Sequence, residues 1–170
     1  MTILALDCST KNTGWSIFKE QELIDYGCIS AGSANLFHRI DKMILELNKI
    51  IEKYKPEKVI IEDVLPADVH NNIKIYKALT YLQGYVLHAL DDNGITDIKF
   101  YTASEWRSKC KIKTGPGIKR ETLKSKDIDF IKQQYGIEVN DDVADAISIG
   151  YAFLSEQNST VEIVDGFEFR

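Results

Sequence analysis

The stretch ILALDCSTKNTGWSIF, residues 3–18, shows how this 170-residue chain begins to fold. The apolar run 3–6 reads as a buried strand, and a carboxylate, Asp7, stands where the run ends. The polar turn TKNTG leads to a second apolar run, 15–18, and the turn KEQE leads to a third, 23–29. Short apolar runs separated by polar turns predict a three-stranded antiparallel meander.

The rest of the chain alternates helices and strands. Apolar residues at three-and-four spacing predict amphipathic helices over 36–51, closed by Pro56, and over 73–90. The runs KVIIEDV and DIKFYT read as buried strands. Three more helices are expected: one with a Thr102 and Glu105 capping box, one from the loop KTGPGIK to about Tyr135, and one over 140–154 with Asn140 as N-cap. This order predicts an α/β fold with helices packed on a mixed sheet, and the tail after Glu156 is not assigned.

The composition is that of an ordinary globular protein, with 44% hydrophobic and 28% charged residues. The length suits a single domain, 1–170, and no apolar stretch reaches the roughly 20 residues that a membrane span needs. No signal peptide is evident, so we expect a cytoplasmic protein with no membrane partner. Three cysteines without paired or C-x-x-C spacing are expected to be reduced thiols and not zinc ligands: Cys8, Cys28 and Cys110.

Charge is unevenly distributed along the chain. The net charge of −5 by itself argues mildly against nucleic acid as a partner. Between 105 and 126, however, eight basic residues stand against two acids, so this segment carries +6 and the remainder −11. The basic residues are Arg107, Lys109, Lys111, Lys113, Lys119, Arg120, Lys124 and Lys126. Any one lysine can be a solvated surface charge, and we prefer that interpretation for Lys124 and Lys126.

Carboxylates end two predicted strands and begin the last helix. Asp7 ends the first strand, and Glu62 and Asp63 end the fourth. Asp142 and Asp145 lie on the last helix. Taken singly, each has an ordinary explanation: a turn-forming Asp, solvated strand-end charges, or acids favoured by the helix dipole. If the first and fourth strands are neighbours, however, three distant parts of the sequence bring acids to one place.

Asp145 is the hardest of these acids to explain as a surface residue. It stands between Ala144 and Ala146 on a helix that is apolar around most of its circumference, about 60° from Asp142. Two acids on a covered face need a compensating charge, and no cluster of Lys or His is near in sequence. Oxygen ligands favour Mg²⁺ or Mn²⁺. Four carboxylates suit two such ions, one activating water and the other stabilising the leaving 3′ oxygen of a phosphodiester.

Four motifs, LALDCSTKNTGWSIF, VIIEDVL, NNIKIYKALTYLQGYVLHAL and DDVADAISIG, resemble in this order the RuvC-like Holliday junction resolvases of the RNase H-like superfamily. The resemblance implies an RNase H-like fold with strand order 3-2-1-4-5. It also implies a homodimer that cuts a four-way junction symmetrically. The helix from Asn71 to Leu90 corresponds to the dimer-forming helix, and a core helix is the alternative that the sequence does not separate from it. The resemblance implies that four acids serve catalysis as ligands of two Mg²⁺ ions, which Mn²⁺ can replace. It implies no nucleotide cofactor. These acids are Asp7, Glu62, Asp142 and Asp145. Asp141, directly before Asp142, is the alternative ligand at that position.

The resemblance also assigns roles to basic residues. Arg107 and Lys119 are the closest counterparts of the family's basic residues after the fifth strand, although one extra residue lies between them. Lys119 would serve catalysis and Arg107 would neutralise the DNA phosphate, while other phosphates would be held by Lys109, Lys111, Lys113 and Arg120. Bacterial members have an aromatic residue three positions after the catalytic Glu. Here that position is Leu65, a departure from the family's pattern, and the residue would serve as an apolar wedge at the junction in place of the aromatic ring. A small resolvase of this kind fits a phage as well as a bacterial host.

Two other functions are alternatives. A module that binds junctions without cutting them would be expected to have lost acids, and all four are present. An actin-like or sugar-kinase ATPase fragment also opens with a strand, an Asp and a small-residue turn, but such ATPases need two lobes around the nucleotide, which 170 residues cannot supply. The leading hypothesis is therefore a Mg²⁺-dependent, structure-selective endonuclease that acts on Holliday junctions and other branched DNA.

Overall fold

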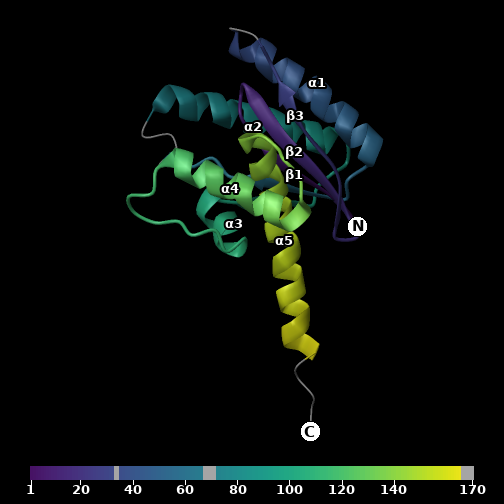
Figure 1. The fold of residues 1–170 in the computed structure, drawn as a ribbon. Coiled ribbons are helices and arrows are strands. Elements are labelled where there is room, and N and C mark those ends of the chain that lie inside the picture. Colours follow the sequence, from purple (N-terminus) through teal and green to yellow (C-terminus); the bar gives the residue numbers. More distant parts are fainter. Residues whose placement is uncertain (33–34, 67–71, 166–170) are drawn as a thin grey trace.

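The computed structural model describes residues 1–32, 35–66 and 72–165, with side chains as far as 158. At its centre is a five-stranded mixed sheet in the order β3-β2-β1-β4-β5 (Figure 1). The first three strands form an antiparallel meander, whereas β1, β4 and β5 run parallel. The strands are β1 (Thr2–Asp7), β2 (Asn12–Lys19), β3 (Glu22–Ser30), β4 (Lys58–Glu62) and β5 (Ile98–Tyr101). The predicted fold and strand order are confirmed.

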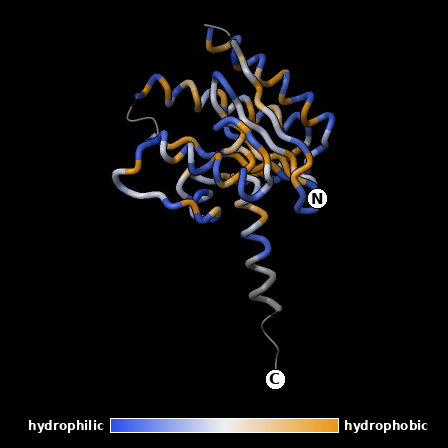
Figure 2. Tube along the Cα trace, in the orientation of Figure 1, coloured by the Kyte–Doolittle hydropathy of each residue, from blue (hydrophilic) through white to orange (hydrophobic). Residues whose placement is uncertain are grey.

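Helices cover both faces of the sheet. They are α1 (Leu36–Tyr54), α2 (Ile73–Asp92), α3 (Ala103–Lys109), α4 (Arg120–Tyr135) and α5 (Asp141–Asp165). The first two pack on one face, and the other three pack on the opposite face (Figure 1). The last part of α5 projects away from the sheet (Figure 1). Figure 2 shows the apolar segments gathered where the sheet meets the helices.

Alternation along β1 decides which side chain faces which layer of helices. Leu4 and Leu6 pack in the core with α1 and α2, whereas Ile3 and Ala5 pack in the core with α5. Successive side chains of a strand point to opposite faces of the sheet. Asp7 therefore belongs to the α5 face.

Every second residue of β2 meets every fourth residue of α5. The pairs are Gly14 with Asp142, Ser16 with Ala146, and Phe18 with Gly150. A Cβ on Gly14 would lie 1.8 Å from the carbonyl oxygen of Asp142, and one on the helix glycine would lie 2.2 Å from the aromatic ring. Ser16 Oγ donates a 2.8 Å hydrogen bond to the carbonyl of Ala146. Two strand residues advance about 6.6 Å and four helix residues about 6.0 Å, so the spacings nearly match.

Local sequence explains where the helices begin. The side chains of Asn35 and Asn72 accept backbone N–H groups in the first turns of α1 and α2. Thr102 and Glu105 form the expected capping box of α3. The Oδ1 atom of Asn140 accepts a backbone N–H of α5 at 3.0 Å, which confirms it as the N-cap.

Two boundaries differ from the prediction. The turn between the first strands is shorter than expected, because strand pairing extends to Asp7 and Gly14. The last helix continues past Glu156 to Asp165, where the sequence assigned no structure. Asn71, the expected start of the second long helix, lies outside the described residues. Within the described part of the chain, no helix is both long and apolar enough to cross a membrane.

Candidate active site

Two of the predicted acids stand side by side at the carboxyl ends of parallel strands. The register of β1 and β4 pairs Leu6 with Ile61, so the next positions, Asp7 and Glu62, are neighbours. Ile60 packs in the core on the α5 side. Alternation along β4 therefore turns Glu62 to the same face of the sheet as Asp7. Both carboxylates lie at one sheet edge, on the side that α5 covers.

The other two predicted acids are on α5, next to this edge. Asp7 pairs with Gly14 across β1 and β2, and Gly14 in turn lies against the carbonyl of Asp142. Asp145, about one turn further along the helix, is 9% exposed. The structure therefore places the acids of the first strand, the fourth strand and the last helix close enough to interact electrostatically.

Burial and mutual repulsion raise the pKa of two of these carboxyls. The pKa of Asp7 is well above its ordinary value, first because burial disfavours the charged form and then because Glu62 and Asp142 carry like charges nearby. Burial likewise raises the pKa of Asp145, and the charges of Asp7 and Asp127 add to the rise. The Oδ1 atom of Asp145 is buried and has no hydrogen-bond partner. A bound cation would relieve this crowding of negative charge.

Two consecutive residues of α3 contact two of the acids. Nε1 of the buried Trp106 donates a 2.6 Å hydrogen bond to Oε2 of Glu62. Arg107 donates to Asp127 from Nε at 3.0 Å and from Nη2 at 2.8 Å. The same Nη2 lies 3.8 Å from Oδ2 of Asp145. Because Trp106 and Arg107 are adjacent in one short helix, α3 orients acids from both β4 and α5.

Lys124 lies at the site, which corrects the expectation that it is a solvated surface charge. Its Nζ forms an ion pair with Asp141 at the start of α5. Its positive charge also counteracts the rise in the pKa of Asp7, ahead of the smaller effect of Arg107. Asp141, which the sequence left as the alternative to Asp142 as a metal ligand, is therefore paired with a lysine. A helix position that looked exposed in sequence faces the acids because α4 packs against α5.

The remaining residues predicted to serve catalysis or DNA binding lie around the site or beyond it. Lys119 and Arg120 are exposed at the start of α4, and Leu65 is partly buried just after β4. The catalytic role of Lys119 and the DNA contacts of Arg120 and Leu65 stay predictions. Arg107, predicted to contact DNA, is mostly occupied by its buried ion pair.

The three lysines that follow Arg107 lie away from the acids. Lys109 pairs with Glu156, far along α5, at 3.3 Å. Lys111 and Lys113 are exposed in the segment between α3 and α4. Their predicted contacts with DNA phosphates stay predictions.

The donor chemistry of the site fits a hard divalent cation, although the side chains do not converge on one coordination centre. The candidate ligands are all carboxylates, and one of their oxygens is buried without a partner. Among the described residues, no three carboxylate, imidazole or thiol groups are arranged as a ready metal cage. Cys8, adjacent to Asp7, is buried, and burial raises the pKa of its thiol, so it stays protonated. Oxygen-only binding by the acids is the chemistry that remains.

Sequence reasoning missed two residues that shape the site. Asp127 is four positions from both Leu123 and Ile131 on α4, so an acid within an apolar stripe was the available signal. Gly14 read as a turn residue, whereas it is a strand residue that admits the first turn of α5. No local pattern marks a glycine as lying beneath a helix that starts 127 residues later.

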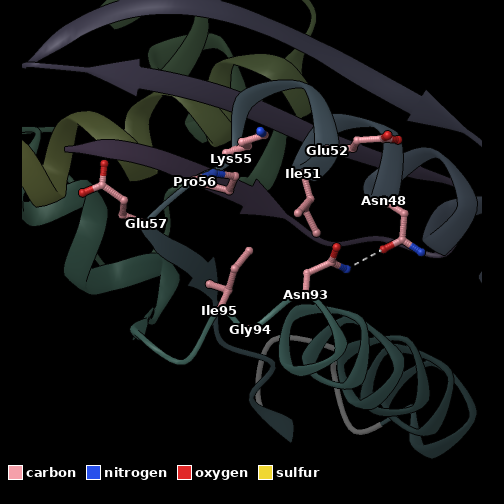
Figure 3. Close-up of a pocket in the computed structure, with 9 residues that line it drawn as sticks. All are labelled: Asn48, Ile51, Glu52, Lys55, Pro56, Glu57, Asn93, Gly94 and Ile95. Carbon is pink, nitrogen blue, oxygen red and sulfur yellow. Dashed lines mark hydrogen bonds between the residues drawn. The ribbon is translucent and has the colours of Figure 1, made fainter.

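An open hollow of about 640 Å³ lies elsewhere, between the ends of α1 and α2 (Figure 3). Asn93 Nδ2 donates a 3.1 Å hydrogen bond to Asn48 Oδ1 beside it. Glu57, which also lines it, directly precedes β4, whereas Glu62 ends that strand. The hollow is therefore at the opposite edge of the sheet and is not part of the candidate active site.

A mixed sheet of order 3-2-1-4-5, with acids at the ends of two parallel strands and on the helix beside them, defines a protein of the RNase H-like fold. Solved structures agree. Thermus thermophilus RuvC in complex with a Holliday junction substrate matches with a TM-score of 0.74 at 12% identity, over 94% of this chain and 96% of that one. A yeast mitochondrial Holliday junction resolvase matches with a TM-score of 0.55 at 16% identity, over 92% and 78%.

The family model described as crossover junction endodeoxyribonuclease RuvC matches residues 3–153, and the chain belongs to this family. The curated member from Koribacter versatilis is 30% identical over 101 residues, which are 56% of this chain and 59% of that protein. The member from Citrifermentans bemidjiense is 38% identical over 72 residues, which are 39% and 44%. The chain thus matches about half the length of these curated relatives.

Proposed function

We propose that this chain is a divalent-metal-dependent, structure-selective endonuclease that resolves four-way DNA junctions by phosphodiester hydrolysis. The observation that carries the proposal is the convergence of mutually repelling carboxyls from β1, β4 and α5. Membership in a family described as crossover junction endodeoxyribonuclease supports the substrate. A RuvC protein that shares the fold has been solved with a Holliday junction.

The metal ligands of this proposal are the four predicted acids, Asp7, Glu62, Asp142 and Asp145. Carboxylate oxygens favour Mg²⁺, and Mn²⁺ is the expected substitute. When bound, such ions supply Lewis-acid activation of water and stabilise the leaving oxygen. The buried, unpartnered Oδ1 of Asp145 is the atom of this set that most needs a cation.

The neighbours of these acids prepare them for this role. Trp106 fixes one oxygen of Glu62 through its indole N–H. Arg107, itself held by Asp127, neutralises part of the charge on Asp145. Lys124 places a positive charge beside Asp7, where it would attract the scissile phosphate and stabilise charge that develops during hydrolysis. Lys119 and Arg120, exposed just before it, would extend this positive charge along the DNA.

The partners of this proposal are branched DNA and a second copy of the chain. Four large side chains on α2 are exposed although they are apolar or aromatic: Ile73, Ile75, Tyr81 and Tyr85. Burying them in a two-fold interface would remove this surface from water. Two-fold symmetry would also place two active sites for paired cuts on opposing strands. Light scattering of the protein in solution measures whether it is a dimer.

The first test is cleavage of a labelled four-way junction, beside linear duplex DNA, with Mg²⁺, with Mn²⁺ and with EDTA. Paired, metal-dependent cuts in the junction are expected from the wild type. Asp7→Asn should abolish them because it removes a ligand charge, whereas Asp41→Asn, at an exposed position of α1, should retain them. Binding without cutting under every metal condition would favour a junction-binding module. The nuclease family match gives no support to the actin-like ATPase alternative.

A further inference from the structure

The turn between β1 and β2, residues 8–11, begins directly after Asp7, at the edge of the sheet that carries the acids. Three successive carbonyl oxygens of this turn accept hydrogen bonds from three different parts of the fold. The acceptors and their donors are Ser9 with Thr13 Oγ1, Thr10 with Arg39 Nε, and Lys11 with the backbone N–H of Ala31, each at 2.9 Å. The backbone of the turn is therefore fixed at three consecutive peptide groups.

Arg39 reaches the turn from the face of the sheet opposite to the acids. It is partly buried in α1, which packs on that opposite face. A trans peptide group holds its C=O and its N–H in one plane, pointing in opposite directions. Because the carbonyl of Thr10 points to Arg39, the N–H of Lys11 points away from α1 and toward the side of the acids. Within the described residues this N–H makes only a long hydrogen bond, 3.5 Å, to Ser9 Oγ.

The side chain of Lys11 adds a positive charge at the same place. It is exposed, and in the part of the chain that the structure describes it forms no ion pair. Lys124, also near Asp7, is by contrast paired with Asp141. An N–H group, an ammonium group and the Ser9 hydroxyl thus lie within three residues of the chain. Such groups bind phosphate oxygens and fix the position of a nucleic-acid backbone.

The turn lies on the side of the acids that α3 does not cover. In the sheet, β1 lies between β2 and β4. The turn joins β1 to β2, whereas Trp106 approaches from the other side, where it donates to Glu62 at the end of β4. A DNA strand with one phosphate at the acids would therefore pass α3 on one side and the turn on the other. The turn is placed to meet the next phosphate of that strand.

We propose that Arg39 is a positioning residue for cleavage: it holds the turn so that the N–H and ammonium groups of Lys11 bind the phosphate next to the one that is cut. The proposal rests on the proposed nuclease function and adds to it a contact on the β2 side of the acids. Arg39 does not touch DNA in this proposal, since it acts through the carbonyl of Thr10. Its loss should therefore impair recognition of one particular phosphate.

The first test separates the hydrogen bond of Arg39 from its charge. Gln has Nε2 where Arg has Nε, both bonded to Cδ, so Arg39→Gln keeps a donor and loses the charge, whereas Arg39→Met loses both. Arg39→Met should lower kcat/KM for a labelled four-way junction about tenfold, as expected for one lost hydrogen bond, and Arg39→Gln should stay within about twofold of the wild type. Lys42→Met, at an exposed position of the same helix, loses the same charge and should cleave as the wild type does.

A neutral methylphosphonate linkage on either side of the cut locates the contact. At one of these two positions it should slow the wild type about as much as Arg39→Met does, and it should slow Arg39→Met little further. Lys11→Gln changes an exposed side chain and leaves the fold intact. In EDTA, it should reduce the slope of log junction affinity against log salt by about 0.9, the contribution of one phosphate contact. Lys19→Gln, exposed at the opposite end of β2, should leave the slope unchanged.

Three results would overturn the proposal. One is an equal loss of kcat/KM in Arg39→Met and Arg39→Gln, and another is an unchanged salt slope in Lys11→Gln. The third is a methylphosphonate that slows Arg39→Met as much as it slows the wild type, because Arg39 would then only support the fold. A wild type that binds junctions without cutting them would refute the nuclease proposal alone. Junction affinities of the same variants and linkages would then decide whether Arg39 and the turn bind phosphate.

Discussion

Arg107→Met would remove the cation that lies between two buried carboxyls, those of Asp127 and Asp145. The Arg107–Asp127 pair has an N–O distance of 2.8 Å, and its side chains are 13% and 0% exposed. Removing one partner of such a pair costs about 3–5 kcal/mol of stability, because the other charge stays buried. For a chain of this length, that corresponds to a fall in Tm of about 6–20 °C.

The measurement is urea unfolding at pH 7 in EDTA, which removes any contribution from bound metal. The matched control is Lys132→Met, which breaks an ion pair with Glu138 of comparable N–O distance, 2.6 Å, between side chains that are 59% and 80% exposed. An exposed pair contributes about 1 kcal/mol or less, so the control should be nearly as stable as the wild type. The difference between the two variants isolates the effect of burial.

A second substitution, Asp127→Leu, completes the cycle. Replacing both members of the pair with apolar side chains should restore most of the lost stability, to within about 2 kcal/mol of the wild type. Junction cleavage by the double variant should be slower than that of the wild type, because Asp145 has lost its neighbouring cation. Two results would contradict this reasoning. One is that Arg107→Met lowers the free energy of unfolding no more than Lys132→Met does, and the other is that adding Asp127→Leu to Arg107→Met lowers it further.

Three further results are expected. Gly14→Ala places a Cβ 1.8 Å from a carbonyl oxygen of α5, so it should cost about 1–3 kcal/mol in urea unfolding and slow cleavage, whereas Gly32→Ala, which meets open space, should change neither. Trp106→Phe removes the hydrogen bond to Glu62 and should lower metal affinity or cleavage about 10- to 100-fold in a metal titration, an outcome that equal activity would contradict. Folding raises the pKa of Asp7, so the metal-free protein should lose stability as pH rises from about 4, the pKa in the unfolded chain, through the pKa in the folded protein. Tm measured against pH in EDTA should show this loss. Mg²⁺ should reverse it near pH 7.

Much of the fold was predictable because the local periodicity of apolar residues indicates strands and helices. The apolar runs of β1 and β4 end in Asp7 and Glu62, and parallel pairing of these strands is enough to bring the two acids together. The helix acids were predictable for a different reason. Asp145 interrupts a nearly continuous apolar surface, and a buried acid requires a partner.

The contacts around the acids were not predictable in the same way, because they depend on packing between distant elements. Lys124 looks like any other lysine of the basic segment until α4 is placed against α5. Asp127 has an informative position, but its partner Arg107 is on another helix. Charge along the sequence also gives no position in space: the fold divides the +6 of residues 105–126 between the surroundings of the acids, where Arg107 and Lys124 lie, and a separate groove. That groove is lined by Lys109, Lys111, Lys113 and Lys126.

The matched spacing of β2 and α5 restricts how the length of this protein can change. One residue inserted between Gly14 and Phe18 would turn every later side chain of the strand to the opposite face of the sheet. The helix α5 would then lose its contacts with those strand residues. One residue inserted between Asp142 and Asp145 would rotate the following part of the helix by about 100° relative to Asp142, so that the two acids would no longer both face Asp7. Length variation among homologues should therefore occur in connections such as 20–21, and not inside either matched segment.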